Sequence, residues 1–248
     1  MLSGLDLTDT QRYRLLDTVD RTSGSIRNCR FDLSEDPVRN VKAIKILDVF
    51  LFNSELTIND DNKYFYFNDG SDQIATIAKK RYDGSNLASA LQTAMNAVSS
   101  GFTVSYDDDT LKFTITNASS FTIQSNTFIN NTDGSSTNIW KRLGIDTSSD
   151  KTGTSITSDN MAVLTSKYNY IVSDIVSAGY TNSNLPDNIM LVVGNTQNFG
   201  NLLSKPSNVI LKSSYETIDK IDLKIYNDDK YLSRREGVDY GLLLEFIH

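Results

Sequence analysis

The feature that most constrains the fold is a pair of short segments in which every second residue is apolar. Residues 102–106 (FTVSY) and 111–115 (LKFTI) alternate in this way, and the three aspartates at 107–109 separate them. A period of two places the apolar side chains on one face of a strand, and aspartates are common in turns. The sequence therefore predicts a β-hairpin over residues 102–115.

Several other segments have the composition of strands. Residues 64–67 and 74–77 flank an Asn-Asp-Gly-Ser turn, which is typical of a second hairpin. The run from Val41, VKAIKILDVFLFNSEL, is dense in β-branched and aromatic residues. Its length leaves a helix open, and we favour a strand. Later strands are predicted at 168–176, 189–193, 209–211, 218–226 and 242–247.

One segment has the periodicity of a helix. Residues 87–98 follow two candidate N-caps, Asp83 and Ser85, and precede Gly101, a typical C-terminal stop. The apolar stripe comprises Leu87, Leu91, Ala94, Met95 and Val98. An amphipathic helix of this kind packs on a sheet, so the stripe is interpreted as core.

Many short strands without regularly spaced helices favour an all-β sandwich or jelly roll over a parallel α/β fold. A chain of 248 residues with 39% hydrophobic residues can form one such domain. We predict an N-terminal arm at 1–35 and a β domain at 36–248. The domain would include a helix-hairpin element at 83–117 and a loop-rich, exposed segment at 125–160.

Composition excludes several classes of function. The formal net charge of −7 and a pI near 4.7 argue against nucleic acid as a specific partner. The only cysteine, Cys29, is predicted to be an inert thiol. The first residues carry charge and lack the apolar core of a secretory signal, and no apolar run approaches the roughly 20 residues of a membrane span. We expect a soluble product without a transmembrane segment.

Residues that support common chemistry are scarce. The only histidine is the final residue, His248, so nucleophilic triads and zinc sites lack their ligands. No phosphate-binding glycine motif is present. The acidic clusters at 60–61, 69–72, 107–109 and 228–229 are interpreted as turns rather than calcium sites. No catalytic, cofactor-binding or metal-binding residue is predicted, although a pair of carboxylates for glycoside hydrolysis stays open.

Two segments carry a resemblance to a known family. Residues 218–247 (IDKIDLKIYNDDKYLSRREGVDYGLLLEFI) contain a turn at 227–230 and a Gly-Val-Asp-Tyr stretch at 237–240 before a last apolar strand. Residues 75–117 place a turn, a helix and a hairpin in succession, and Leu-Gly-Ile follows at 143–145. The key positions of this second segment are Tyr82, Leu87, Leu91, Phe102 and Phe113, and a further similar strand lies at 168–173. This pattern resembles the penton and minor capsid proteins of virophages, polinton-type elements and related DNA viruses.

The resemblance implies a jelly-roll β-sandwich with one inserted helix and hairpin and an N-terminal arm. It also implies a structural virion protein rather than an enzyme, made as a soluble protein in the host cell and located in the capsid. Its expected partners are further copies of itself, as a homopentamer at the five-fold vertices, and the major capsid protein. Two alternatives stay open. One is a minor capsid or cement protein, and the other is a carbohydrate-binding or attachment sandwich that uses exposed tyrosines and Trp140.

Overall fold

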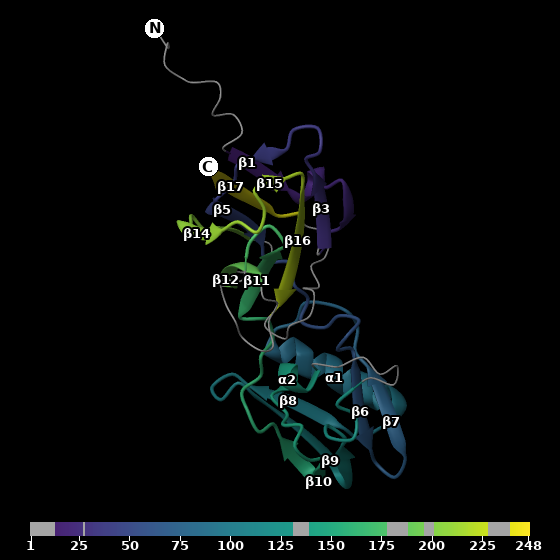
Figure 1. The fold of residues 1–248 in the computed structure, drawn as a ribbon. Coiled ribbons are helices and arrows are strands. Elements are labelled where there is room, and N and C mark those ends of the chain that lie inside the picture. Colours follow the sequence, from purple (N-terminus) through teal and green to yellow (C-terminus); the bar gives the residue numbers. More distant parts are fainter. Residues whose placement is uncertain (1–12, 27, 131–138, 178–187, 196–200, 228–238) are drawn as a thin grey trace. The chain divides into compact units, whose positions relative to one another are not determined.

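The computed structural model describes residues 13–26, 28–130, 139–177, 188–195, 201–227 and 239–248 (Figure 1). The chain divides into two compact units. The first comprises Met1–Glu55 and Ser166–His248, and the second comprises Leu56–Thr165. We call them the jelly-roll unit and the inserted unit. Each has its own sheets and its own hydrophobic core.

The first sheet of the jelly-roll unit, called the β5 sheet, is built around a ten-residue strand. Its order is β1 (Tyr13–Asp17), β17 (Gly241–Ile247), β5 (Ala43–Phe52) and β13 (Leu202–Ser204), and β14 (Val209–Lys212) also pairs with β5. All pairs are antiparallel. Because β13 and β14 pair with successive parts of β5, they act as one interrupted strand.

The second sheet, called the β16 sheet, lies on the other side of the core. Its order is β12 (Ile189–Gly194), β11 (Tyr168–Ser173), β16 (Lys220–Asn227), β3 (Asn28–Asp32) and β2 (Ser23–Ser25). A small two-stranded sheet joins β15 (Thr217–Ile218) to β4 (Val38–Arg39), and the 3-10 turn η2 spans Thr18–Asp20. All pairs of the β16 sheet are antiparallel as well.

The pairing of these strands defines a jelly roll. The principal strands in chain order are β1, β3, β5, β11, β12, β13–β14, β16 and β17. The first pairs with the last, the second with the seventh, the third with the sixth, and the fourth with the fifth. This is the pattern of one long antiparallel ribbon rolled into two facing sheets. The all-β jelly-roll fold predicted from the sequence is confirmed.

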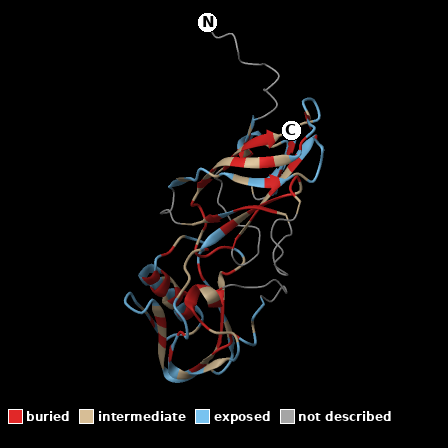
Figure 2. Cartoon of the chain, turned by 60° about the vertical axis from the view of Figure 1, so that its left-hand side comes forward, coloured by how far each residue is buried: buried red, intermediate tan, exposed pale blue. Residues whose placement is uncertain are grey.

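The core of the jelly-roll unit lies between the inner faces of its two sheets, as the red bands on alternate strand positions in Figure 2 indicate. In β5, Ile44, Ile46, Val49 and Leu51 are buried, and their neighbours are more exposed. The change of phase between Ile46 and Val49 coincides with a bulge against β17. Ile221, Leu223 and Ile225 of β16 complete the core from the opposite sheet.

The inserted unit contains the hairpins and the helix predicted from the sequence. Its sheet has the order β10 (Lys151–Thr157), β9 (Lys112–Ile123), β6 (Tyr64–Asn68) and β7 (Asp72–Thr76), and β8 (Thr103–Asp107) pairs with β9. Helix α1 (Gly84–Val98) contacts β7 and β8. Asp83 is its N-cap, because the carboxylate Oδ1 accepts a hydrogen bond of 2.8 Å from the Asn86 N–H.

The two residues of the jelly-roll unit that flank the inserted unit are hydrogen-bonded to each other. Glu55 and Ser166 are both buried. The Glu55 carboxylate accepts hydrogen bonds from the Ser166 hydroxyl, at 2.7 Å, and from its N–H, at 3.2 Å. Asn195 donates to the Ser166 carbonyl at 3.1 Å. The end of the third principal strand and the start of the fourth are therefore joined by hydrogen bonds within the jelly-roll unit itself.

The structure corrects two boundaries. Residues 13–32, predicted as part of an arm, supply β1 and β3 to the two sheets, because their apolar positions pair with the last strands of the chain. Residues 1–12 of the predicted arm lie outside the described residues. The segment 125–160, predicted as an exposed loop, contains β10 and the short helix α2 (Ile139–Leu143), whose apolar residues are buried. The single domain at 36–248 is replaced by two units.

We predict that Gly84→Ala destabilises the inserted unit. A Cβ at Gly84 would collide with the ring of Tyr106, which packs on Phe113 with ring centroids 4.8 Å apart. Overpacking of this kind costs about 1–3 kcal/mol. The matched control is Gly153→Ala, whose Cβ would meet only ordinary van der Waals contacts. Chemical denaturation of both variants checks the prediction, and equal free energies of unfolding would contradict it.

Candidate functional site

The side chains most often used in catalysis or metal binding have structural roles in this protein. The ring Nδ1 of His248 lies 2.7 Å from the carbonyl of Arg39 at the exposed chain end. Cys29 is buried in β3, and this burial raises the pKa of its thiol. Among the described residues, no group of three or more histidine, cysteine or acidic side chains is arranged to hold a metal ion. Attention therefore turns to the surfaces of the two sheets.

The Gly-Val-Asp-Tyr stretch of the resemblance connects the start of the last strand to the end of the first. Thr18 is fully buried, and its N–H donates to the Tyr240 carbonyl at 2.9 Å. Its hydroxyl donates to Asp239 Oδ1 at 2.8 Å and accepts from the Tyr240 N–H at 2.9 Å. Arg21 adds a contact of 3.4 Å to the same carboxylate. Residues 228–238, which hold the rest of this motif and of its turn, lie outside the described residues.

The second resembling segment supplies core positions of the inserted unit. Its key residues, Tyr82, Leu87, Leu91, Phe102, Phe113 and Leu143, are all buried. Gly144 of the Leu-Gly-Ile element has a φ of 72°, and a Cβ there would collide with the carbonyl of Asn160. A glycine is required at that turn for both reasons. The motif residues thus serve folding rather than binding.

Trp140 does not fit the ligand-binding alternative. Its side chain is 2% exposed, and the indole Nε1–H donates to the Phe128 carbonyl at 2.9 Å. The ring also packs against Phe65, with centroids 5.4 Å apart. An aromatic platform for a sugar must face solvent, so Trp140 is a core residue and not a stacking surface.

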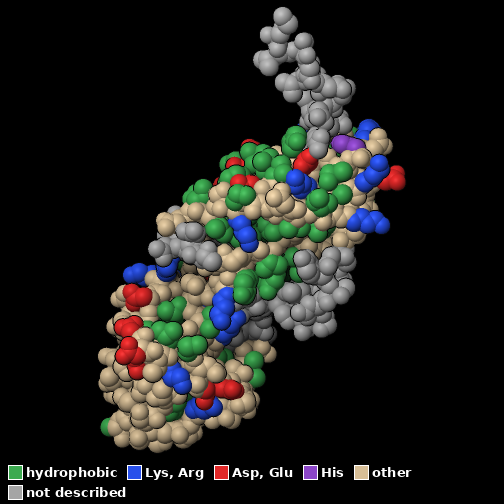
Figure 3. All heavy atoms as spheres, turned by 90° about the vertical axis from the view of Figure 1, so that its left-hand side faces the viewer, with side chains coloured by type: hydrophobic (Ala, Val, Ile, Leu, Met, Phe, Trp, Pro, Cys, Tyr) green, Lys and Arg blue, Asp and Glu red, His purple; other side chains and the backbone are tan. Residues whose placement is uncertain are grey.

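The outer face of the β5 sheet carries a continuous row of apolar side chains. Leu15 pairs with Leu243, Gly241 with Phe50, and Leu202 with Phe52. We call Leu15, Leu243, Phe50, Phe52 and Leu202 the apolar band. Leu15 is 61% exposed and Leu202 is 45% exposed, while the other three are partly buried against their neighbours. Figure 3 shows hydrophobic side chains gathered on the side of this unit that carries His248, the purple residue.

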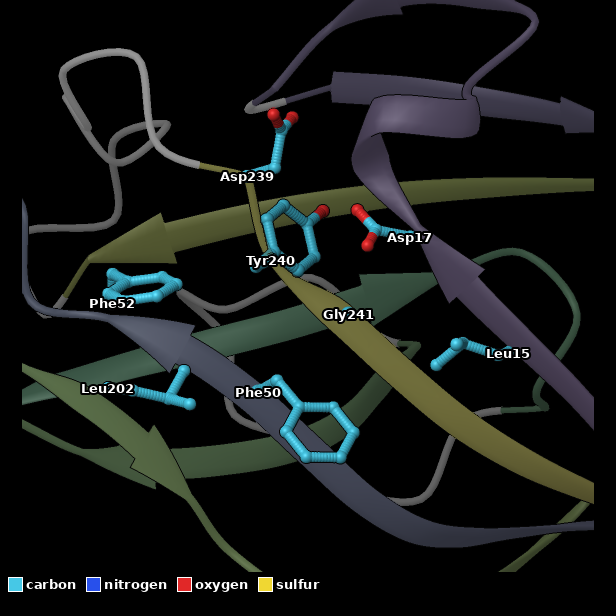
Figure 4. Close-up of a pocket in the computed structure, with 8 residues that line it drawn as sticks. All are labelled: Leu15, Asp17, Phe50, Phe52, Leu202, Asp239, Tyr240 and Gly241. Carbon is cyan, nitrogen blue, oxygen red and sulfur yellow. The ribbon is translucent and has the colours of Figure 1, made fainter.

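The apolar band surrounds a pocket of about 510 Å³. Its lining comprises Leu15, Asp17, Phe50, Phe52, Leu202, Asp239, Tyr240 and Gly241 (Figure 4). Gly241 lies between the apolar side chains in this view, with the two aspartates toward one end. A Cβ at Gly241 would contact Phe50 and Leu15 at 3.6 and 3.8 Å, so the absence of a side chain there keeps the pocket open.

The charged residues of this outer face are mainly acidic. Asp17 and Asp239 line the pocket, and Asp48 accepts hydrogen bonds from Ser204. Glu245 lies 3.7 Å from the ammonium of Lys45. The outer face therefore combines an apolar centre with a charged border, in which Arg21 contacts Asp239 and Lys45 contacts Glu245. This composition is typical of a surface that binds another protein.

The outer face of the β16 sheet carries a second group of apolar side chains, most of them tyrosines. Tyr170 pairs with Val192 on one side and with Tyr226 on the other. Tyr168 and Val192 are 48% and 38% exposed. We call Tyr168, Tyr170, Val192 and Tyr226 the tyrosine face. Charged side chains of both signs border it, because Lys220 lies opposite Asp32 and Asp222 lies opposite Arg30 at outward positions on the adjoining strands.

One ion pair on this face has a clear electrostatic effect. The Arg30 guanidinium donates to both carboxylate oxygens of Asp222, from Nε at 2.7 Å and from a terminal nitrogen at 2.8 Å. This two-point hydrogen bond holds the pKa of Asp222 below its ordinary value, although partial burial opposes the shift. Arg30 and Asp222 thus offset each other's charge on this face.

The sequence did not identify either face. Leu15 and Asp17 lie in the segment interpreted as an arm, where the sequence YRLLD does not alternate apolar and polar residues. Phe50 and Phe52 lie in a run that is almost entirely apolar. Its sequence alone does not show which side chains face inward, because the bulge against β17 changes the phase of the alternation. The segment at 125–160, which was predicted to be exposed, is described only in part, and the apolar residues of its helix α2 are buried in the core.

Comparison with solved structures finds proteins of similar fold. No family model matches the sequence, and no curated protein does. The fold is similar to the crystal structure of the mavirus penton protein, with 11% sequence identity over 95% of this chain and 99% of that chain. The TM-score is 0.45. The jelly-roll assignment rests on the strand order described above. Within the described residues, no helix is long and apolar enough to cross a membrane.

We predict that Thr18→Val lowers the free energy of unfolding by about 1–3 kcal/mol, because the buried Tyr240 N–H loses its acceptor. Valine keeps the shape of the side chain, so the loss reports the hydroxyl alone. Thr18→Ser keeps the hydroxyl and serves as the control. Urea denaturation of the three proteins measures the difference, and a Thr18→Val protein as stable as the parent would contradict the role of this hydrogen bond.

A second prediction concerns the pKa of Asp222 and the stability of the fold at acid pH. The folded-state pKa of Asp222 lies below its unfolded value, so this pair stabilises the fold above the unfolded pKa and stops doing so as pH falls through the folded pKa. Arg30→Gln should raise the pKa of Asp222 toward its ordinary value. Carboxyl NMR titration measures this shift. Asp60, whose pKa is lowered by Lys63 and Lys79, is the internal control and should not change.

Proposed function

We propose that this chain is a self-assembling structural subunit of a virus particle, most specifically the penton at the five-fold vertices of the capsid. The observation that carries the proposal is a jelly roll with apolar side chains on the outer faces of both of its sheets. The fold of an isolated sandwich needs apolar side chains only on the inner faces of its sheets. Leu15 and Leu202 on one face and Tyr168 and Val192 on the other remain for contacts between subunits.

The resemblance of residues 75–117 and 218–247 to penton and minor capsid proteins supports the same function. The residues behind that resemblance build the two cores and the junction between β1 and β17. They are the parts of the chain that give a rigid shape. A capsid subunit works through its shape, because symmetric assembly requires each copy to present the same surfaces in the same relative orientation.

A penton role implies further partners. The expected ones are additional copies of this chain and the major capsid protein that surrounds a vertex, and the expected location is the virion. An enzymatic role has no support from a described cluster of catalytic groups. The alternative is a minor capsid protein, which would become ordered beside the major capsomers without forming its own ring. The measurement of mass described next distinguishes it from a penton.

The mass of the protein in solution tests this proposal. A homopentamer of the 27.7 kDa chain would give about 140 kDa, and closed symmetry would make that species discrete. Size exclusion with light scattering over a range of concentration and salt measures it. A discrete peak near that mass would support the penton, and a chain that stays at the mass of one copy throughout would contradict self-assembly.

A further inference from the structure

One end of the jelly-roll core is lined by asparagines instead of aliphatic residues. On four strands, an asparagine lies two positions beyond the last inward-facing aliphatic side chain, on the strand or directly after it. The pairs are Leu51 and Asn53 on β5, Ile171 and Asn169 on β11, Val193 and Asn195 on β12, and Ile225 and Asn227 on β16. Alternate residues of a strand face the same side, so each asparagine lies on the inner side of its sheet. We call these four asparagines the asparagine layer.

The β16 sheet brings three members of the layer to the same end of the core. Asn169 is paired directly with Asn227. On its other side Asn169 is paired with Val193, and Asn195 follows Val193 by two residues. The Asn195 side-chain amide donates to the Ser166 carbonyl at 3.1 Å. Neighbouring strands of one sheet therefore change from aliphatic to amide side chains at the same level.

The facing sheet brings the fourth asparagine to a similar depth. Asn53 lies two residues before Glu55, and Asn169 lies three residues after Ser166. The Glu55 carboxylate accepts hydrogen bonds from Ser166, so both chain segments run into the sandwich from this contact. Because a strand rises by about 3.3 Å per residue, Asn53 and Asn169 lie at comparable distances from it.

Asn169 is the member of the layer whose side chain needs a further partner. It is 0% exposed, and neither its Oδ1 nor its Nδ2 has a hydrogen-bond partner in the part of the chain that the structure describes. A buried polar group left unpaired loses the hydrogen bonds that it makes with water in the unfolded chain. Buried side-chain amides are therefore nearly always bonded, either to the protein or to ordered water.

The chemistry of the amide determines what can bind it. Oδ1 accepts hydrogen bonds, and Nδ2 donates two. A metal ion would satisfy the oxygen alone, and an apolar molecule would satisfy neither atom. A water molecule both donates and accepts, and it is small enough for a site that is closed to solvent.

We propose that the asparagine layer is an internal water site, in which at least one ordered water molecule is hydrogen-bonded to the side-chain amide of Asn169. This inference does not depend on the proposed function. The site also favours the native register of its strands. A slip of two residues in β11 or β16 keeps the same face inward, but it moves an asparagine among aliphatic side chains and an aliphatic side chain against the water.

A crystal structure of the full chain, at a resolution that shows ordered water, tests the site directly. We expect a water molecule within about 2.7–3.2 Å of Oδ1 or Nδ2 of Asn169. Water at either atom supports the inference. An Asn169 amide that has no water at either atom, whether it is bonded to protein groups instead or left unpaired, overturns it.

The variant Asn169→Leu tests the site in solution. Leucine is close to asparagine in size but cannot bond to water, so the bound water loses a partner. The equilibrium constant for folding should then fall about ten-fold or more, and the midpoint of urea denaturation should fall with it. If the amide is dry in the folded protein, its removal relieves an unpaired buried group, and the midpoint should rise instead.

The matched control is Ile171→Leu, which changes an inward side chain of the same strand without altering a polar group. Exchanges that conserve volume in this way have small effects on stability. We expect the denaturation midpoint of Asn169→Leu to lie below that of Ile171→Leu, and the crystal structure of the control to retain the water. A midpoint for Asn169→Leu equal to or above that of the control would contradict the water site.

Discussion

The pairing of the first described strand with the last strand is the constraint on which the jelly-roll unit depends. β17 lies between β1 and β5, so the β5 sheet is continuous only when both ends of the chain have been brought together. Thr18 secures this junction with three hydrogen bonds to Asp239 and Tyr240. Contacts so distant in sequence carry a large loop-closure cost, which the buried residues of both sheets must offset.

Rolling the ribbon in this way also determines where function can lie. Each sheet turns one set of side chains inward to a shared core and the other set outward. The inward set includes Ile44 and Leu223, which are fully buried, and the outward set includes Leu15 and Tyr168, which are 61% and 48% exposed. The interior of the jelly-roll unit is filled by its own core, so a partner would bind at its surface, where the described residues offer the two outer faces and the pocket over Gly241.

The inserted unit adds a second core without breaking the first. Its strands and helix occupy the connection between β5 and β11, the third and fourth principal strands. Glu55 and Ser166 bond to each other directly at the two ends of this connection. Long insertions between strands are tolerated when the ends are already held together, because loop-closure entropy rises only slowly with length. The helix and hairpins predicted from the sequence belong to this unit.

The sequence by itself determined the local elements: the hairpins around 64–76 and 102–115, the helix near 87–98, and most later strands. These follow from residue periodicity and turn residues, which act over a few positions. It also placed Trp140 in an exposed loop and residues 13–32 in an arm, and both were wrong. Burial of Trp140 and pairing of β1 with β17 depend on residues far along the chain. Only the tertiary structure decided which alternating side chains face outward, because a strand pattern does not say which of its faces the rest of the chain will cover.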